Sequence, residues 1–590
     1  MSIVSLKKIT MYGCVSEKAL MLEQLQMMGC LHIIPLSPPK DILEKGKLSS
    51  RSREALMYLQ SCPQQLKQIK DDTDFNPMAI ERQLLQNKKR MEELQDEKDR
   101  VQHDKQKLEP WGNFVLPAPA EIGNLRFWFY VIPHGEMKKI NTKELCILQV
   151  NKDNRFCYVV VISEQEPPSM TGKLVCLCRE SLEQLETRLD DLEFEMEDLQ
   201  AERLRLTRWL YLFEENFYQL EDRTVLQDAA KKTYDREAVF ALKGWIPASE
   251  VERIREYAKQ HQVAVTIQEP SPTDMPPTLL CNKPLLRGGE DLLSFYMTPS
   301  YRLWDPSAIV FFSFALFFAM IFSDAGYGIL FGAILLYFWK SLGTSVAKQR
   351  FRIVLLTLTL FSAFWGILVG SYFGIEPHAQ SILGYFKIIN MNNYDAMMGL
   401  SILIGTAHIT LANLAQGWSK RKSLTAIASF GWAVTAVGGF LVFSNHQYME
   451  GFKLLSVGGY FLIGLGLLAV VLFTSIEGPV WNRLLRGIIG LTRISGMFGD
   501  VLSYLRLFAL GLASASLAKV FNDLARQVYL ALPGFNVAIA LLIILMGHGM
   551  NFALSVMSGF IHGLRLNYIE FFNWGLPKEG SPFKAFSKRR

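Results

Sequence analysis

The sequence predicts a soluble α+β domain followed by an α-helical membrane domain that crosses the bilayer several times. Residues 1–300 are rich in Lys, Glu, Gln and Asp, whereas residues 301–590 are dominated by Leu, Phe, Gly, Ala and Ile. Long apolar runs recur through the second half, and about 20 apolar residues suffice for an α-helix to span a bilayer. The opening residues MSIVSLKKITMYG lack the apolar core of a signal peptide, so we expect the soluble half to stay in the cytoplasm.

The soluble half is predicted to hold two lobes joined by a long antiparallel coiled coil. Leucines and other apolar residues follow a 3-4 spacing through 178–222, which predicts one long helix whose seam is broken only at Arg203. A weaker apolar repeat runs through the last part of an earlier helical arm, within 51–108. It places Asn87, Lys98 and Lys105 at seam positions. The two arms most simply pair as a stalk.

Strand–helix–strand patterns at both ends of the soluble half, over 3–36 and 237–269, predict a proximal α+β lobe made from distant parts of the chain. The domain boundaries that follow are 1–50 for its first half, 51–108 for the first coiled-coil arm, 109–177 for a distal α+β lobe, 178–225 for the second arm, 226–300 for the second proximal half with a linker, and 301–590 for the membrane domain. This plan suits a mechanical strut; a regulatory or oligomerising coiled coil is the alternative.

Apolar runs in the second half predict eight transmembrane helices, near 307–322, 325–342, 352–374, 397–417, 425–444, 454–474, 488–520 and 533–572. The last two are longer than a span requires, so we expect them to be long and tilted. The SDAGYG segment predicts a tight turn between the first two, with Asp324 near the outer surface.

The distribution of basic residues predicts that both termini are cytoplasmic. With the N-terminus inside, the inner loops hold basic clusters within 340–352, 420–422 and 483–493, and the tail adds five more Lys and Arg residues. The outer loops hold little beyond Lys387, Lys453 and Arg526. Positive residues favour the cytoplasmic side, so an even number of spans fits this bias.

Arg506 lies within SYLRLFALGLASASLA, a stretch that is otherwise apolar or small. A guanidinium at membrane depth costs about 2.5–3.5 kcal/mol on insertion scales. It also cannot lose its proton to avoid that cost. The small residues Ala509, Ala513 and Ser516 follow at helical spacing and would let another helix approach closely. A partner carboxylate on another chain is one interpretation; an internal pair with Asp500, Glu477 or a backbone carbonyl is the other.

The last predicted helix carries a polar stripe along one face. Its members are spaced 3, 4, 3, 4 and 3 residues apart: His548, Asn551, Ser555, Ser558, His562 and Arg565. The stripe runs for about 26 Å, most of the hydrocarbon thickness, so it must face water or polar partners. Hydrogen bonding between helices is the plainer explanation. The second arginine at its end favours an ion path.

The rest of the composition excludes several classes of function. All eight Cys residues fall in the soluble half and are scattered, which predicts reduced structural thiols and no metal. The sequence contains no GxxxxGK[ST] or HExxH motif, so we expect neither nucleotide hydrolysis nor a cofactor. The stalk has mixed charge, which argues against nucleic acid as a partner.

The chain resembles subunit I (subunit a) of the rotary V-type and A-type ATPases over nearly its whole length. The matching motifs occur in order: GWIP at 244–247, PPTLLCN at 276–282, YRLWDPS at 301–307, SDAGYG at 323–328, SYLRL at 503–507 and IHGLRLNYIEFF at 561–572. The resemblance implies a non-catalytic stator subunit that conducts H⁺ or Na⁺ through two half-channels. The chain is shorter than typical eukaryotic relatives, which favours a bacterial or archaeal plasma membrane.

The resemblance also implies partners and residue roles. The partners are rotor-ring proteolipids that carry a membrane carboxylate, peripheral-stalk subunits, and the central stalk and ATPase head. Arg506 corresponds to the arginine that faces the rotor ring, Arg565 to a supporting arginine, and His562 to a polar position of the ion path. The stripe from His548 to His562 is then a candidate outer half-channel, and Asp500 with Glu477 a weaker inner one.

Two positions depart from the pattern of some relatives. Ser555 stands where those relatives have an acid ten residues before the second arginine, and Ser514 stands where they have a His eight residues after the first. These departures leave the polar groups of the outer channel open. A secondary transporter or channel with a regulatory coiled coil is the alternative function; it predicts an inverted repeat with interrupted helices.

Overall fold

The computed structural model describes residues 2–36, 46–71, 75–117, 123, 125–137, 146–167, 170, 172–378, 380–391, 393–448, 453–476, 479–531 and 536–588. Its contacts divide the chain into two compact units. One unit comprises Met1–Cys14, Cys30–Ile34 and Ala241–Phe586. The other comprises Val15–Gly29, Pro35–Phe240 and Ser587–Arg590, so both units combine distant parts of the sequence.

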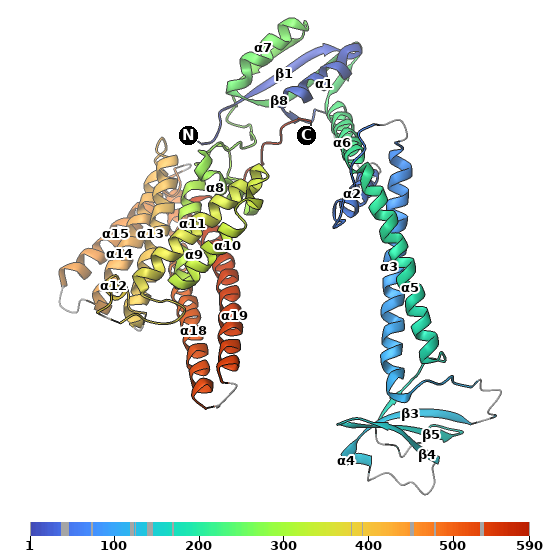
Figure 1. The fold of residues 1–590 in the computed structure, drawn as a ribbon. Coiled ribbons are helices and arrows are strands. Elements are labelled where there is room, and N and C mark those ends of the chain that lie inside the picture. The colour runs from blue at the N-terminus through green and yellow to red at the C-terminus, as the bar shows by residue number, and fades with distance from the viewer. Residues whose placement is uncertain are drawn as a thin grey trace. The chain divides into compact units, whose positions relative to one another are not determined.

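Two long helices, α3 (Pro77–Leu108) and α5 (Leu182–Leu206), lie side by side in the second unit (Figure 1). Salt bridges join them, among them Lys105–Glu186 at 2.8 Å, Lys98–Glu193 at 2.7 Å and Arg90–Glu195 at 2.7 Å. Residue numbers fall along one helix as they rise along the other, so the two helices are antiparallel. The lysines at seam positions thus reach carboxylates on the opposite helix, while their apolar stems remain at the seam.

The second arm is interrupted, so the prediction of one helix over 178–222 is wrong. A 3₁₀ turn, Thr207–Trp209, separates α5 from α6 (Leu210–Lys232). Thr207 explains the break: its hydroxyl donates to the Leu204 carbonyl at 2.6 Å and accepts from the Leu66 amide at 3.0 Å. The segment that follows α2 (Gly46–Gln60) therefore crosses the stalk here, and the first arm is likewise two helices, α2 and α3.

A buried polar junction holds α2 against the stalk. The Asn87 side chain is 2% exposed; it donates to the Leu199 carbonyl at 2.9 Å and to Glu202 at 2.7 Å. It also accepts from the Tyr58 hydroxyl at 2.9 Å. Arg203, where the apolar seam breaks, lies 4.0 Å from the centre of the Tyr58 ring. The polar residues at the seam thus contact a third helix, α2, which the heptad pattern alone does not predict.

At the end of the stalk lies a four-stranded antiparallel sheet with the order β4-β5-β3-β6 (Figure 1). Its strands are β3 (Arg126–Pro133), β4 (Cys146–Lys152), β5 (Phe156–Ser163) and β6 (Lys173–Val175), and the short helix α4 (His134–Met137) follows β3. Trp111, just after α3, packs edge-on against Phe129 at 5.1 Å and so fixes the sheet to the end of the helix.

A second sheet has the order β2-β8-β1-β9, with β7 paired to β8. Its strands are β1 (Leu6–Cys14), β2 (His32–Ile34), β7 (Tyr234–Arg236), β8 (Val239–Pro247) and β9 (Ala264–Gln268). The helices α1 (Lys18–Met28) and α7 (Val251–Gln260) lie between them in sequence. Strands from both ends of the soluble half therefore share one sheet, since β1 pairs with β9 and β2 with β8.

The C-terminal tail joins the N-terminal segment in the first unit. The Phe586 amide donates to the Leu31 carbonyl at 2.7 Å, and the Lys584 amide to the His32 ring at 3.0 Å. The Phe583 amide donates to the Thr278 carbonyl at 3.0 Å. These backbone contacts keep the chain beyond the last helix beside the strand that begins at His32.

The second half is helical. Its helices are α8 (Arg287–Tyr296), α9 (Ser307–Phe322), α10 (Ala325–Tyr337), α11 (Val346–Val369), α12 (Ile382–Tyr385), α13 (Tyr394–Ser419), α14 (Ala426–Tyr448), α15 (Lys453–Phe473), α16 (Val480–Gly490), α17 (Arg493–Leu502), α18 (Leu505–Ala531), α19 (Asn536–Arg565) and α20 (Phe572–Gly575), with a π-helix at Leu566–Phe571. Of the described residues, six helical segments are long and apolar enough to cross a membrane: Val346–Val369, Tyr394–Ser419, Ala426–His446, Ser456–Phe473, Val480–Ala531 and Asn536–Gly575.

The first two predicted spans, α9 and α10, are apolar but only 16 and 13 residues long. Eight crossings therefore remain a prediction, while six helices meet the length that a bilayer requires. The turn between α9 and α10 is buried. Asp324 is 2% exposed and accepts from the Tyr327 amide, the Ser371 hydroxyl and the Phe373 and Gly374 amides at 2.6–3.0 Å. Its carboxylate is thus a structural cap of α10.

The predicted helix over 488–520 lies within the helical segment Val480–Ala531, which two turns interrupt. The chain turns after α16 and again at Ser503–Tyr504, between α17 and α18. Tyr504 explains the second turn: it is fully buried, and its hydroxyl lies 2.8 Å from His408 Nδ1. The ring occupies the space beside Gly405, where an added Cβ would come within 2.7 Å of it.

We expect Asn87→Ala to lower the free energy of unfolding of the soluble half by about 1–3 kcal/mol, because Tyr58 and Glu202 lose a buried hydrogen-bond partner. Denaturant unfolding followed by circular dichroism measures the change. Lys89→Ala is the matched control, since Lys89 is on the same helix and its side chain is 78% exposed. Equal stability of the two variants would contradict the role given to Asn87.

Candidate functional site

Arg506 lies in the first turn of α18, directly after the turn at Ser503–Tyr504. Its side chain is half-buried, and its Nη1 is buried without a hydrogen-bond partner among the described residues. The charges that act on it are Arg565, of like sign, and Glu570, of opposite sign. An arginine in this position retains its charge, so part of its hydrogen-bonding capacity is left for a further partner.

The small residues that follow Arg506 form an open face. Ala509, Ala513 and Ser516 are all exposed. The opposite face of α18 is buried, including Gly511, where an added Cβ would come within 2.6 Å of the Met320 carbonyl oxygen. The sequence predicts that the small face receives a neighbouring helix. Among the described residues no helix covers these three positions, which is what a partner on another chain requires.

Two further unpartnered polar atoms lie near this arginine. His562 Nδ1 is buried without a hydrogen-bond partner among the described residues, and both arginines act on this histidine. Glu570 is 2% exposed, and its Oε2 also has no partner within the described part of the chain. Arg565 itself is exposed. Arg506, His562, Arg565 and Glu570 are hereafter the charged cluster.

Sequence reasoning missed Glu570. It named Asp500 and Glu477 as possible internal partners of Arg506 but not Glu570, although Glu570 lies within the IHGLRLNYIEFF motif. The sequence did contain a signal for Glu570, because an ionisable residue in an apolar run is a functional candidate whatever the sign of its charge. What hid it was the spacing: Glu570 follows Arg565 by five residues, which places the two on different faces of an α-helix.

The outer part of the polar stripe is bonded to other helices of the chain. Asn551 is 1% exposed and donates to the Tyr327 hydroxyl at 3.0 Å and to the Ser514 carbonyl at 2.9 Å. His548 Nδ1 lies 2.7 Å from the same hydroxyl, and its Nε2 lies 3.0 Å from Asn522 Oδ1. These contacts favour the packing interpretation for His548 and Asn551.

The donors and acceptors of this network assign the state of His548. Asn551 donates to the Tyr327 oxygen, so the phenolic proton is free to donate to His548 Nδ1. Asn522 donates to the Phe373 carbonyl at 2.8 Å and so presents its oxygen to Nε2. Every bond is then satisfied by a neutral imidazole with its proton on Nε2. Because Tyr327 is fully buried, a second ring proton would deprive its hydroxyl of an acceptor.

The remaining stripe residues differ in their surroundings. Ser555 is 3% exposed, and its hydroxyl lies 2.7 Å from that of Ser514. Ser558 and His562 are half-buried. The stripe therefore changes from bonded and buried at Asn551 and Ser555 to more open toward Arg565.

Of the two acids proposed for the inner side, the structure describes only Asp500. Asp500 accepts from the Trp574 indole at 2.7 Å and from the Asn573 amide at 3.2 Å. Glu477 lies outside the described residues. Of these two positions, only Asp500 can therefore be placed, at the end of α17 beside α20.

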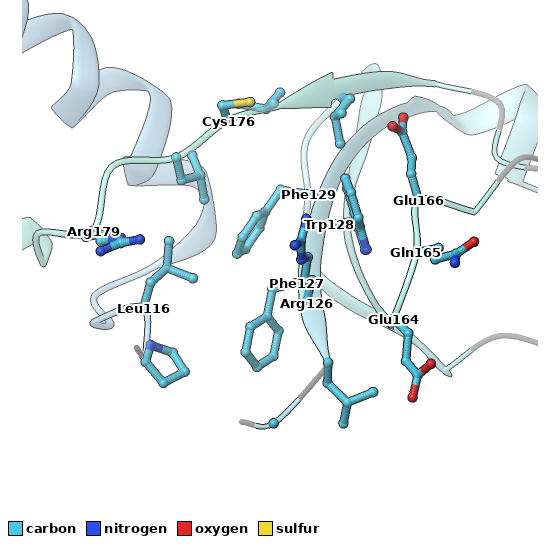
Figure 2. A pocket seen from close by; sticks show the side chains of 16 residues that line it. Leu116, Arg126, Phe127, Trp128, Phe129, Glu164, Gln165, Glu166, Cys176 and Arg179 are labelled. Atoms are coloured by element: carbon cyan, nitrogen blue, oxygen red, sulfur yellow. The ribbon is translucent and has the colours of Figure 1, made fainter. Parts of the chain in front are cut away.

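A separate hollow lies on the distal sheet (Figure 2). Aromatic rings of Phe127, Trp128 and Phe129 line it together with charged side chains of Arg126 and Glu166. No group of three or more metal-ligating side chains occurs in the part of the chain that the structure describes. The hollow is thus a mixed aromatic and charged surface without the residues of a metal site.

Comparison with known proteins identifies the family. Residues 177–382 match the family described as the V-type ATPase 116kDa subunit family. The chain is 25% identical to the V-type ATP synthase subunit I of Borreliella burgdorferi over 619 aligned positions that cover 100% of both chains. The family model and the similar chains together support assignment to the V-type ATPase 116kDa subunit family.

Other members of this family match over part of their length. The V-type ATP synthase subunit I of Chlamydia trachomatis serovar D is 28% identical over 61% of this chain and 63% of its own. The A-type ATP synthase subunit I of Methanocaldococcus jannaschii is 28% identical over 69% of this chain and 64% of its own. A crystal structure of the cytoplasmic N-terminal domain of subunit I, a homolog of subunit a of V-ATPase, aligns with 44% of this chain and 99% of its own at 14% identity and a TM-score of 0.21.

The family assignment and the six apolar helical segments together make this chain a multi-pass membrane protein of a V-type or A-type ATPase. The two positions that depart from the pattern of some V-type ATPase relatives, Ser514 and Ser555, are hydrogen-bonded to each other.

We expect Tyr327→Phe to lower the free energy of unfolding by about 1–3 kcal/mol, because His548 Nδ1 would lose its buried donor. Unfolding of the detergent-purified protein measures this. Tyr337→Phe is the matched control on the same helix, since Tyr337 is 83% exposed. If both variants unfold alike, the network around His548 contributes nothing to stability.

Proposed function

We propose that this chain is the non-catalytic stator subunit of a rotary V/A-type ATPase and conducts H⁺ or Na⁺ to and from carboxylates of the rotor ring. One observation carries the proposal: Arg506 has an unpartnered, buried Nη1 beside the open face of Ala509, Ala513 and Ser516. A permanent cation with spare donors next to an uncovered small-residue face suits a carboxylate that arrives on another chain.

The electrostatics give the mechanism. A carboxylate in lipid is stable only when a proton or Na⁺ neutralises it. When rotation brings it beside Arg506, the fixed cation favours the ionised carboxylate, which releases its ion. Arg565 is a second positive charge acting at the same place and reinforces this effect. The cationic pair would also block direct passage of cations between the two sides of the membrane.

Two offset half-channels would connect the rotor carboxylate to the two aqueous sides. For the outer one, the half-buried residues Ser558 and His562 are better suited to a wet path than Asn551 and Ser555, which are already hydrogen-bonded. For the inner one, the candidate is Asp500, near the C-terminal end of α17.

The C-terminal tail supports a cytoplasmic location for both termini. Its hydrogen bonds to the Leu31–His32 segment support an arrangement in which the chain ends on the side of the membrane where it began. This agrees with the basic inner loops and with an even number of spans. We further propose a prokaryotic plasma membrane as the location, and an anchoring role for the ion-paired stalk, whose distal lobe would bind peripheral-stalk subunits that resist torque.

We expect Arg506→Ala and Arg506→Lys to abolish ion pumping by the assembled complex in vesicles while assembly survives. Lys is a poor replacement because its proton can be lost on burial. Arg526→Ala is the matched control, an exposed arginine of the same helix. Normal pumping by both Arg506 variants would overturn the function, as would purification of the chain without ATPase subunits or a proteolipid ring, which a transporter would give.

The part of the polar stripe that is proposed to line a water-filled path, at Ser558 and His562, can be tested separately. We expect Ser558→Leu to slow pumping several-fold in complexes that assemble normally, because the larger apolar chain would obstruct a water-filled path. Ser555→Leu should instead reduce assembly, since Ser555 is 3% exposed and bonded to Ser514. Unchanged pumping in Ser558→Leu complexes would show that the whole stripe is packing.

A further inference from the structure

We propose that Glu570 is the inner proton-exchanging carboxylate of this chain, which gives protons to and takes them from the rotor carboxylate on the cytoplasmic side of Arg506. The inference rests on the proposed function and names the residue of its inner half-channel. Glu570 lies beyond Arg565 in the chain, toward the tail that bonds to the Leu31–His32 segment. It therefore lies on the side of the charged cluster that faces the soluble half.

Glu570 is buried in a way that structural carboxylates seldom are. Its side chain is 2% exposed, and its Oε2 has no hydrogen-bond partner among the described residues. Asp324, the other fully buried acid near these helices, accepts four hydrogen bonds. A buried carboxylate with an unused oxygen is costly unless charge compensates it, so its retention calls for a use.

The π-helix determines which way the Glu570 side chain is turned. In a regular α-helix, Arg565 and Glu570 would be separated by about 140° around the axis. The π-helix at Leu566–Phe571 has i→i+5 bonding, which brings residues five apart onto one face. Asn567 stabilises this turn, since it accepts from Ser313 at 2.5 Å and donates to the Gly563 carbonyl at 3.1 Å. Glu570 is thereby turned toward the two arginines, both of which act on it.

The charges around Glu570 favour proton exchange with the rotor carboxylate over a permanent ion pair with the two arginines. Two cations and one carboxylate leave the cluster with a net positive charge, so a rotor carboxylate is still attracted to Arg506. Exchange is then balanced: the O–H bond of the rotor carboxyl breaks, a new O–H bond forms on Glu570, and the negative charge moves to the rotor group beside Arg506. The reverse transfer loads the rotor from the cytoplasm.

Two other titratable groups lie around the π-helix, and of their polar atoms Nε2 of His408 is buried without a partner among the described residues. On α13, His408 is bonded through Nδ1 to Tyr504 and stacks on Phe571 at 4.3 Å. Asp500 accepts from Trp574 and Asn573 on α20. The helix α9 carries no charged residue. Glu570 is therefore the carboxylate next to Arg506 and Arg565 with a free oxygen in the described part of the chain.

A route from Glu570 to the cytoplasm is also present. Ser503 interacts with the Glu570 carboxylate and is half-buried. Asp500 precedes it by three residues, about one helical turn nearer the soluble half. A proton could thus pass from Glu570 past Ser503 to the mouth at Asp500.

The test compares Glu570→Gln, Glu570→Asp and the control Glu579→Gln, an exposed acid of the same segment, in complexes reconstituted into vesicles. Initial ATP-driven proton pumping is measured as a function of pH on the side of the ATPase head. We expect Glu570→Gln to slow pumping by roughly 100-fold. Glu570→Asp should pump with a displaced pH profile, and Glu579→Gln should match the unaltered complex.

Three results would overturn the inference. They are normal pumping by Glu570→Gln, equal impairment of the Gln and Asp variants with an unchanged pH profile, and Na⁺ pumping that is indifferent to Glu570→Gln. Arg506→Ala separates the two proposals. If it stops pumping while Glu570→Gln does not, only the role of Glu570 fails; if Arg506→Ala pumps normally, the proposed function itself fails.

Discussion

The constraint on which the membrane half depends is one permanent cation, Arg506, whose hydrogen-bonding groups the chain itself does not fully satisfy. Its helix buries Gly511 against α9 and leaves Ala509, Ala513 and Ser516 uncovered. The turn at Ser503–Tyr504 sets where α18 begins, and the buried pair of Tyr504 and His408 holds that turn. These features preorganise a positive site against an open face, so that a mobile carboxylate finds donors already in place.

The polar groups near this site divide into two kinds. Around Tyr327, each donor meets an acceptor, and the neutral ring of His548 completes the set. Such a network stabilises helix contacts and resists a change of charge. In the charged cluster, by contrast, atoms of Arg506, His562 and Glu570 remain without partners. Buried groups that are left unsatisfied are costly, which is why the proposed function is assigned to the charged cluster.

The polar residues inside the stalk can be compared with those of the charged cluster. Polar residues at the stalk seam, such as Asn87 and Arg203, are satisfied by α2 through Tyr58 and by Glu202. Lysines farther along the seam pair with glutamates of the opposite helix. Such pairs between the helices favour one register of the stalk.

The sequence by itself determined the division into soluble and membrane halves and the antiparallel stalk pattern, and it singled out Arg506 and Arg565 as candidates, because hydropathy, heptad spacing and charge cost are local properties. It did not determine where helices break, since Thr207 and Tyr504 end helices through contacts with residues distant in sequence. Nor did it show that Ser514 and Ser555 face one another or that Glu570 joins the arginines. Those relations depend on helix packing and on a π-helix that shifts the register of side chains, and only the tertiary structure decides them.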